Sequence, residues 1–227
     1  MKRFGPRSES AGHRRQPGKR VLDLIIVLPA CVFLLPLTAM IAMLVRLRLG
    51  TPVLFRQRRP GKDEKPFTLF KFRTMTDARN ERGELLPDGE RLTRLGRFLR
   101  ETSLDELPEL FNILRGDLSL VGPRPLLLQY LPYFTVRERL RHAVPPGLTG
   151  WAQINGRNYL PWDERLALDV WYVENWSIAL DLRILALTVW KVLRREGVAA
   201  DTDTAETDLD RERQGRAAGR TMTFPSI

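Results

Sequence analysis

The longest uncharged stretch of the chain runs from Leu24 to Val45 and is almost entirely apolar. As a straight helix with a rise of about 1.5 Å per residue it reaches roughly 33 Å, enough to cross the hydrocarbon core of a bilayer. Pro29 and Pro36 lie inside the stretch. Because each proline removes a helical hydrogen bond and disturbs the preceding turn, the pattern predicts a kinked apolar helix.

Basic residues lie on both sides of this stretch, among them Lys19 and Arg20 before it and Arg46 and Arg48 after it. The positive-inside rule therefore cannot choose which end is cytoplasmic, and the simplest topology keeps both ends there. A signal peptide or a single-pass anchor is the alternative. The apolar run is longer than the usual ~7–15 residues of a signal peptide, and no clear small-residue cleavage site follows it. The sequence thus favours a re-entrant helix over residues 19–50.

Shorter hydrophobic patterns follow in residues 51–200, which we interpret as the soluble body. Two runs rich in aromatic and β-branched residues predict short strands, and runs with helical spacing predict helices. The last of these helices either packs against the core or lies in the membrane interface. The expected fold is mixed α/β and mostly helical. The predicted strands are 53–57 and 67–75, and the predicted helices are 90–103, 103–114, 162–176 and 181–195.

Both ends of the chain lack such patterns. Residues 1–18 combine Arg and Lys with Gly, Ser and Pro and predict a disordered basic arm. Residues 201–227 mix charged and small residues and predict a disordered tail.

The amino-acid composition limits the kinds of site that the chain can form. The chain has 227 residues, a formal net charge of +10, one Cys and two His. A disulfide-stapled secreted fold and a standard Cys/His zinc site are therefore excluded, and a histidine-based catalytic triad is disfavoured. Glycine-rich dinucleotide and P-loop motifs are also absent from the sequence. Any phosphate chemistry must therefore use Arg, Lys and a metal ion.

The acidic pair Asp105–Glu106 is the most informative candidate site. Ser103 and Glu106 also fit a capping box, so helix capping is one role for Glu106. Adjacent acids in a helix project about 100° apart, which suits a glycosidase pair poorly. They can instead serve one divalent cation, or divide the roles of nucleophile and metal ligand.

Cationic residues at strand ends and rigid turns favour the chemical role. Guanidinium groups held by Pro and Gly turns suit the oxygens of a diphosphate, because a bidentate contact needs a preset donor geometry. The residues concerned are Lys71, Arg73, Arg97, Arg100, Arg124 in Gly-Pro-Arg-Pro, and Arg157 after Asn-Gly.

Five motifs in this order give a specific resemblance: KRVLDLIIVLPACVFLLPL, FRQRRPG, FKFRTM, SLDELPELFNILRGDLSLVGPRP and PPGLTGWAQINGRN. Over residues 19–198 the chain closely resembles the bacterial sugar transferases that are small monotopic phosphoglycosyl transferases. One departure lies in the membrane helix, where Leu35-Pro36 stands at the family's common Ser-Pro.

The resemblance implies transfer of a sugar phosphate from a UDP-sugar to polyprenyl (undecaprenyl) phosphate, with release of UMP. It assigns the nucleophile to Asp105 and the Mg2+ ligand to Glu106. It assigns phosphate binding to Lys71, Arg73, Arg100, Arg124 and Arg157.

The same resemblance places the protein at the bacterial inner membrane, with membrane lipid as a partner and the catalytic domain on the cytoplasmic face. Downstream glycosyl transferases are further candidate partners, and no nucleic acid is expected. Overall similarity favours an N-acetylated or bacillosamine-like sugar, followed by galactose or glucose. Two alternatives stay open: a glycosyl transferase that releases UDP, and a non-catalytic basic membrane protein that binds anionic lipid or nucleic acid.

Overall fold

The computed structural model of the chain describes residues 16–156, 160–194 and 209–221. Most of the predicted basic arm and the candidate phosphate ligand Arg157 lie outside these ranges, as do residues 195–208 and 222–227.

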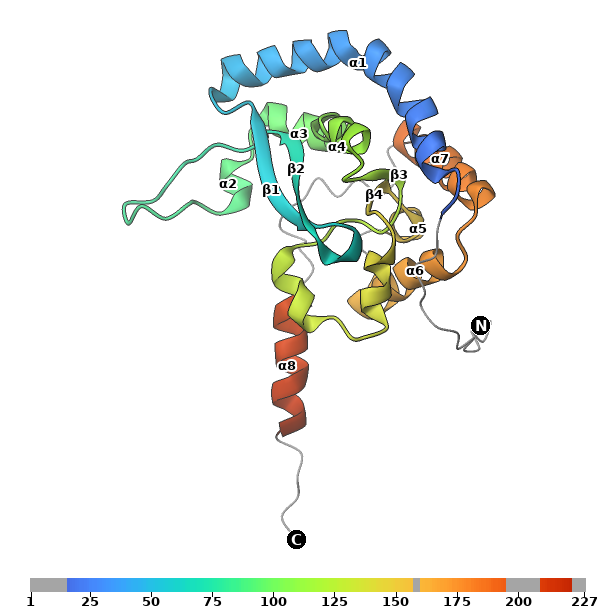
Figure 1. Cartoon of the computed structure of the whole chain (residues 1–227). Coiled ribbons are helices and arrows are strands. Elements are labelled where there is room, and N and C mark those ends of the chain that lie inside the picture. Colours follow the sequence, from blue (N-terminus) through green and yellow to red (C-terminus); the bar gives the residue numbers. More distant parts are fainter. Residues whose placement is uncertain (1–15, 157–159, 195–208, 222–227) are drawn as a thin grey trace.

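The described chain is mostly helical and contains two small sheets, which confirms the predicted mixture of structure. In Figure 1, α1 arcs over one side of the body and α8 protrudes from the opposite side. The helices are α1 (Lys19–Leu49), α2 (Asp88–Arg91), α3 (Arg94–Glu101), α4 (Glu109–Arg115), α5 (Trp151–Ile154), α6 (Trp162–Glu174), α7 (Ile178–Leu193) and α8 (Leu209–Thr221). The strands are β1 (Leu54–Pro60), β2 (Pro66–Phe72), β3 (Ser119–Val121) and β4 (Gly147–Thr149). The short 3-10 helices are η1 (Lys62–Glu64), η2 (Leu104–Glu106), η3 (Leu128–Tyr133) and η4 (Glu138–Ala143).

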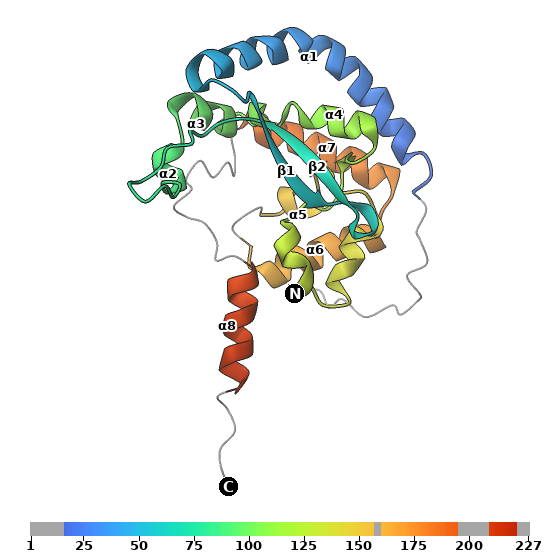
Figure 2. The same cartoon turned by 60° about the vertical axis from the view of Figure 1, so that its left-hand side comes forward.

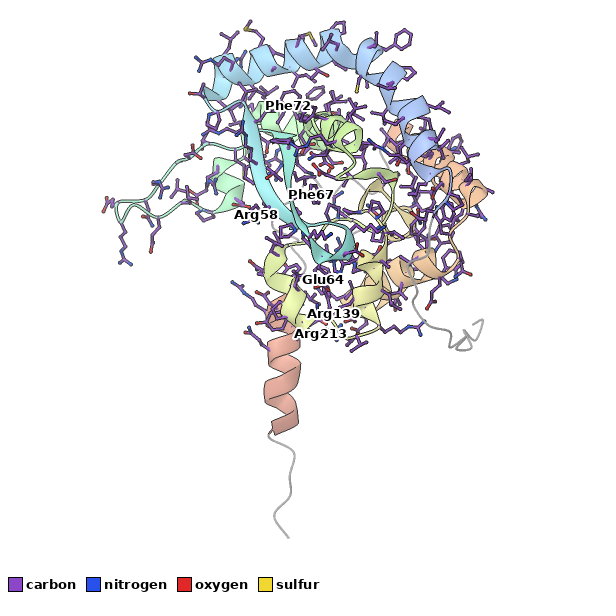
Figure 3. The ribbon with its side chains drawn as sticks, in the orientation of Figure 1. Arg58, Glu64, Phe67, Phe72, Arg139 and Arg213 are labelled. Atoms are coloured by element: carbon purple, nitrogen blue, oxygen red, sulfur yellow. The ribbon has the colours of Figure 1, made fainter. Side chains whose placement is uncertain are left out.

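The two predicted strands form one antiparallel hairpin, β1–β2, with Arg58 opposite Thr68. Phe67 and Leu69 lie on one face of β2 and are buried in one core cluster, whereas Phe72 lies on the other face and is buried in a second cluster. Figure 3 shows Phe67 and Phe72 at the two ends of this strand. Lys71 occupies the position before Phe72 and therefore shares the face of Phe67 and Leu69, at the end of the strand.

The second sheet consists of β3 and β4, which run parallel. Gly122 follows β3 directly, and its N–H donates to the carbonyl of Thr149 at 2.8 Å. A Cβ atom at Gly147 would lie 2.0 Å from the backbone nitrogen of Gly122. Only glycine permits this approach, which fixes the start of the Gly-Pro-Arg-Pro turn against β4.

Helix α1 remains continuous through Pro29 and Pro36 and curves over the body in both views (Figures 1 and 2). Near the second proline, the Thr38 hydroxyl donates to the carbonyl of Leu34 at 2.8 Å. Such back-bonding bends helices, so Thr38 contributes a hydroxyl close to the place of the family's serine.

The outer face of α1 is a row of exposed apolar side chains, which point away from the body in Figure 3. By length and composition this helix could cross a membrane. Exposed apolar surface of this extent marks an interaction with lipid or protein. The exposed residues are Val21, Ile25, Leu28, Val32, Phe33, Leu35, Met40, Met43, Leu44 and Leu47.

Both ends of α1 are attached to the same body. At its start, Lys19 Nζ lies 2.6 Å from Asp181 Oδ2, and both residues are buried. One turn later, Asp23 accepts hydrogen bonds from the Ser119 hydroxyl and the Leu120 N–H. At its end, the Arg73 guanidinium donates to the carbonyl of Leu49 at 3.2 Å. Both ends of the helix are therefore fixed to the body, and Val27, Ile41 and Val45 on its inner face are buried against it.

The predicted helices at 162–176 and 181–195 are α6 and α7. Helix α7 begins at Ile178, where the Ser177 hydroxyl caps the Leu180 N–H. Ile184 on one face is fully buried in the core, whereas Val189 and Trp190 are exposed. One face of this helix thus packs in the core, and its other face is exposed; the membrane-interface role stays a prediction.

The helix predicted from Ser103 to Leu114 is wrong in its first half. The segment forms the 3-10 turn η2 and then α4. Pro108 has no N–H to bond the carbonyl of Leu104, which disfavours an α-helix across this point, and Pro108 is the N-cap residue of α4. Ser103 has a left-handed φ of 56° and makes no side-chain capping hydrogen bond. The capping box is therefore absent, and Glu106 has other partners.

The prediction of a disordered tail over 201–227 is also wrong for residues 209–221, which form α8. Leu209 is fully buried in a cluster with Tyr130 and Trp162. Arg213 Nη2 lies 2.7 Å from Glu138 Oε1 and 2.6 Å from Asp163 Oδ1. Figure 3 shows Arg213 where α8 meets the body. One apolar anchor, one bridging arginine and hydrogen bonds of Asp210 and Gln214 to η3 thus hold a helix whose composition is otherwise polar.

We predict that Leu209→Ala detaches α8, because a buried Leu→Ala change costs about 2–5 kcal/mol and few other apolar contacts hold this helix. Hydrogen exchange of residues 209–221 is the measurement, and protection should fall at least tenfold. Arg211→Ala, on an exposed position of the same helix, is the control. Unchanged protection in Leu209→Ala would contradict the docking role of Leu209.

Candidate active site

A cavity of about 1500 Å3 lies between the hairpin, η2, the Gly-Pro-Arg-Pro turn, α5 and α7. Asp105 and Glu106 line it, together with Lys71, Arg100 and Arg124. Leu34 of α1 and Val189 of α7 line the same cavity. Charged and apolar walls therefore share one space, which extends from the acidic pair to the two helices with exposed apolar faces.

Two cations from different elements converge on Glu106. Lys71 Nζ of β2 donates to Glu106 Oε1 at 2.6 Å, and Arg124 Nη2 donates to the same oxygen at 3.0 Å. Burial alone would raise the pKa of Glu106, but the charges of Arg124 and Lys71 outweigh it and lower the pKa to about 2. Glu106 is therefore ionised at any physiological pH.

Asp105 has a different environment although it is the adjacent residue. Its side chain is mostly buried, and burial raises its pKa, while the charges of Lys71 and Arg100 act in the opposite direction. Arg100 is fixed by a hydrogen bond from its Nε to the Thr74 hydroxyl at 3.1 Å. A partly desolvated carboxylate beside cations is suited to nucleophilic attack on an anionic phosphate.

Glu109 is a second buried acid that sequence reasoning missed. It lies one helical turn after Glu106 and is 3% exposed, and its Oε1 is 3.2 Å from Lys71 Nζ. Burial and then the charge of Glu106 raise the pKa of Glu109 to about 7. The i, i+3 spacing of the two acids was the available signal, but nothing in the sequence showed that Lys71 lies between them.

Asn112 explains how Lys71 reaches this place. Its side-chain amide is fully buried and bonds the backbone of β2 at two points. It accepts from the Phe70 N–H at 3.1 Å and donates to the Thr68 carbonyl at 2.7 Å. Asn112 thereby fixes α4 against β2, and this register sets Lys71 beside Glu106 and Glu109.

The Gly-Pro-Arg-Pro turn is held from behind by buried charges. Arg141 Nη2 donates to the carbonyl of Arg124 at 2.7 Å, and the same nitrogen lies 2.7 Å from Asp169 Oδ2. Both Arg141 and Asp169 are almost fully buried. On the other side, Arg59 donates to the carbonyl of Pro125. These contacts fix the direction in which Arg124 leaves the turn.

Among the predicted phosphate ligands, Lys71, Arg100 and Arg124 surround the acidic pair. Arg73 also lines the cavity, but its guanidinium is engaged by the carbonyls of Leu49, Thr51 and Met75 and by Asp77. It thus joins the end of α1 to the hairpin. Arg157 lies outside the described residues.

The acidic pair fits Mg2+ better than a metal held by a full protein cage. Among the described residues there is no group of three His, Cys, Asp or Glu side chains that could hold a metal ion. Mg2+ commonly uses one or two carboxylates and takes its other ligands from substrate phosphates and water. Both cations that contact Glu106 use Oε1, so Oε2 is the oxygen suited to a metal ion.

The family model for bacterial sugar transferases matches residues 14–195 and so covers the hairpin, the acidic pair and the cationic turns. The chain belongs to the bacterial sugar transferase family. This confirms the resemblance based on the five motifs, and with it the expected enzyme class, phosphoglycosyl transferase.

Three relatives show which proteins this transferase is similar to in sequence. It is 58% identical over 184 residues to the uncharacterized sugar transferase EpsL of Bacillus subtilis, covering 79% of this chain and 89% of the relative. It is 38% identical over 183 residues to UDP-glucose:undecaprenyl-phosphate glucose-1-phosphate transferase of Escherichia coli, covering 76% of this chain and 39% of that one. It is 38% identical over 204 residues to UDP-galactose-lipid carrier transferase of Erwinia amylovora, covering 82% and 43%. The transferase thus spans about two fifths of these two longer relatives.

We predict that Glu109→Gln changes how the stability of the transferase depends on pH. Because the pKa of Glu109 is raised from 4.5 to about 7, the folded state binds more protons than the unfolded state between these values. The contribution of Glu109 to stability therefore falls as the pH rises through this window. The free energy of unfolding of the variant, relative to that of wild type, should therefore be up to about 3 kcal/mol larger at pH 8 than at pH 4.5. One pKa unit corresponds to about 1.4 kcal/mol.

Urea unfolding in detergent micelles at several pH values measures this difference. Glu101→Gln, at an exposed position of α3, is the matched control. A Glu109→Gln variant whose stability stays parallel to that of wild type from pH 4.5 to pH 8 would show that Glu109 is ionised throughout.

Proposed function

We propose that this transferase moves a sugar phosphate from a UDP-sugar to polyprenyl phosphate, giving polyprenyl diphosphate sugar and UMP through a covalent aspartyl intermediate. The observation that carries the proposal is the acidic pair at the cavity wall, with Lys71 and Arg124 converging on Glu106 beside the partly desolvated Asp105. The relatives named as undecaprenyl-phosphate phosphotransferases support the same reaction.

In the first step, a carboxylate oxygen of Asp105 attacks the phosphorus nearest the sugar. The bond from this phosphorus to the oxygen that bridges the two phosphates breaks, and UMP leaves with the electron pair. Lys71, Arg100 and Arg124 bind the diphosphate oxygens and offset their charge. Glu106 would hold Mg2+, which supplies further neutralisation of phosphate charge when bound.

In the second step, a phosphate oxygen of polyprenyl phosphate attacks the same phosphorus, and the bond to Asp105 breaks to restore its carboxylate. This acceptor is already ionised, so the step needs no strong general base. His142, the histidine within the described residues, is not placed to act as such a base. Burial and the charge of Arg141 lower the pKa of His142 to about 3, and this imidazole is not among the cavity-lining residues.

The membrane helix determines how the lipid acceptor reaches the site. We infer that α1 enters one leaflet with its apolar outer face and returns, because both of its ends attach to the same body. The catalytic body then lies on the cytoplasmic face, as the basic residues at both flanks favour. Leu34 of α1 and Val189 of α7 line the cavity, so a polyprenyl chain can enter from the membrane side.

The names of the relatives bear on the choice of sugar. They specify glucose and galactose, whereas overall motif similarity favoured an N-acetylated sugar. UDP-glucose and UDP-galactose are therefore the first substrates to test.

We predict that, without polyprenyl phosphate, the wild-type enzyme releases about one equivalent of UMP from its UDP-sugar, and that turnover continues when undecaprenyl phosphate is added. Asp105→Asn should lower turnover by at least on the order of a thousandfold, because it removes the nucleophile. Glu106→Gln should fold normally and lose most activity. A coupled UMP assay with product identification is the measurement, and exposed Glu101→Gln is the control. UDP as the product would favour the glycosyl transferase alternative.

We predict that residues 17 and 62 lie on the same side of the membrane. Single cysteines at the exposed positions Pro17 and Lys62, in a Cys31→Ser background, should both resist an impermeant thiol reagent applied to intact cells. Both should react after the cells are opened, which is the control for accessibility. If only the cysteine at position 17 is labelled in intact cells, α1 spans the membrane and is not re-entrant.

A further inference from the structure

Gln153 is a buried polar side chain that the reaction above does not use. It belongs to α5, lines the cavity and is 9% exposed. Neither its Oε1 nor its Nε2 has a hydrogen-bond partner in the described part of the chain. Buried amides are nearly always hydrogen-bonded, because an unpaired donor or acceptor costs about 1–3 kcal/mol. An amide that is kept in a cavity wall at this cost points to a ligand that pairs with it.

The position of this amide is fixed by the same backbone that carries Arg124. A Cβ atom at Gly150 would lie 2.5 Å from Gln153 Oε1 and 2.1 Å from the carbonyl oxygen of Gly122. Gly122 is the first residue of the Gly-Pro-Arg-Pro turn, and β4 holds it through Thr149. The amide therefore lies next to the turn that directs Arg124 toward Glu106.

Neighbouring polar groups do not satisfy Gln153. On the same cavity wall, the hydroxyls of Thr149 and Thr188 lie 2.7 Å apart, and Thr188 also donates to the carbonyl of Ile184. These two hydroxyls bond each other and the backbone. Within the described residues, the donor and the acceptor of Gln153 are thus buried without partners, in a side chain that lines the cavity.

We propose that the Gln153 amide determines substrate specificity by binding a neutral group of the nucleotide sugar that donates and accepts hydrogen bonds at once. This inference rests on the proposed function. Two parts of a UDP-sugar have this chemistry: adjacent sugar hydroxyls and the imide edge of uracil. The phosphates are anionic acceptors without donors and are matched by Lys71, Arg100 and Arg124 instead. A site that hydrogen-bonds a substrate in this way strongly rejects an analogue lacking the partner group.

Gln153→Leu is the test, because it keeps the approximate volume and removes both polar atoms. If the amide serves only the ligand, the melting temperature of the ligand-free variant should be equal to or above that of wild type, since an unpaired buried group is removed. The KM for the preferred UDP-sugar should nevertheless rise at least tenfold. A structural role predicts the reverse: a lower melting temperature and an unchanged KM. Gln129→Leu, at an exposed position outside the cavity, is the matched control.

Inhibition by UDP then shows whether the Gln153 amide binds the sugar hydroxyls or the uracil. A parallel rise in the inhibition constant of UDP assigns the amide to uracil. An unchanged constant, with a changed ratio of UDP-glucose to UDP-galactose turnover, assigns it to the sugar. Wild-type KM and inhibition constants in Gln153→Leu would overturn the inference.

The proposed function can fail separately. If the wild-type enzyme releases UMP from neither sugar nucleotide, the proposed reaction is wrong for these substrates. Calorimetric titration of wild type and Gln153→Leu with UDP-glucose would still test the amide, and equal affinities would overturn its role.

Discussion

The site depends on one constraint: a single carboxylate oxygen of Glu106 lies between two cations that come from distant parts of the chain. Lys71 arrives on β2 and Arg124 on the turn after β3, and both must be correctly placed at once. Much of the surrounding fold serves this placement. Asn112 fixes the register of β2 against α4, and Arg141 holds the backbone of the turn. A shift of either element would leave a mostly buried carboxylate short of a partner, which is costly.

The same arrangement gives two adjacent acids different properties. The pKa of Glu106 is lowered to about 2, whereas burial raises that of Asp105. One acid is thereby a permanent anion held in place by cations, and the other is a less solvated group facing the cavity. Pairs of acids whose environments separate their pKa values in this way divide their roles. The curved α1 adds the second condition, because its Leu34 contributes to the apolar part of a cavity that also holds the charged groups.

Local patterns in the sequence predicted the hairpin, α6, α7 and the apolar helix, because the periodicity of their side chains reflects which face is buried. The acidic pair and its cations could be proposed from residue types at turns. The convergence of Lys71 on both Glu106 and Glu109 could not, since it depends on Asn112 joining two elements far apart in sequence. The break at Pro108 overrode the capping pattern at Ser103, and α8 was missed because a single buried Leu209 anchors it. Gln153 lies in the fifth motif, but nothing in the sequence showed that its amide is unpaired, because that depends on its surroundings.

The central claim is that Asp105 becomes covalently bonded to the sugar phosphate while Lys71, Arg100 and Arg124 bind the diphosphate oxygens. Peptide mass spectrometry of the wild-type enzyme, mixed with UDP-glucose or UDP-galactose without polyprenyl phosphate and quenched in acid, tests it directly. The account predicts a hexose-phosphate adduct on the peptide that contains residue 105, located on Asp105 by fragmentation and removed when undecaprenyl phosphate is added. An adduct on another residue, or an unmodified enzyme that still releases UMP once the acceptor is present, would contradict it.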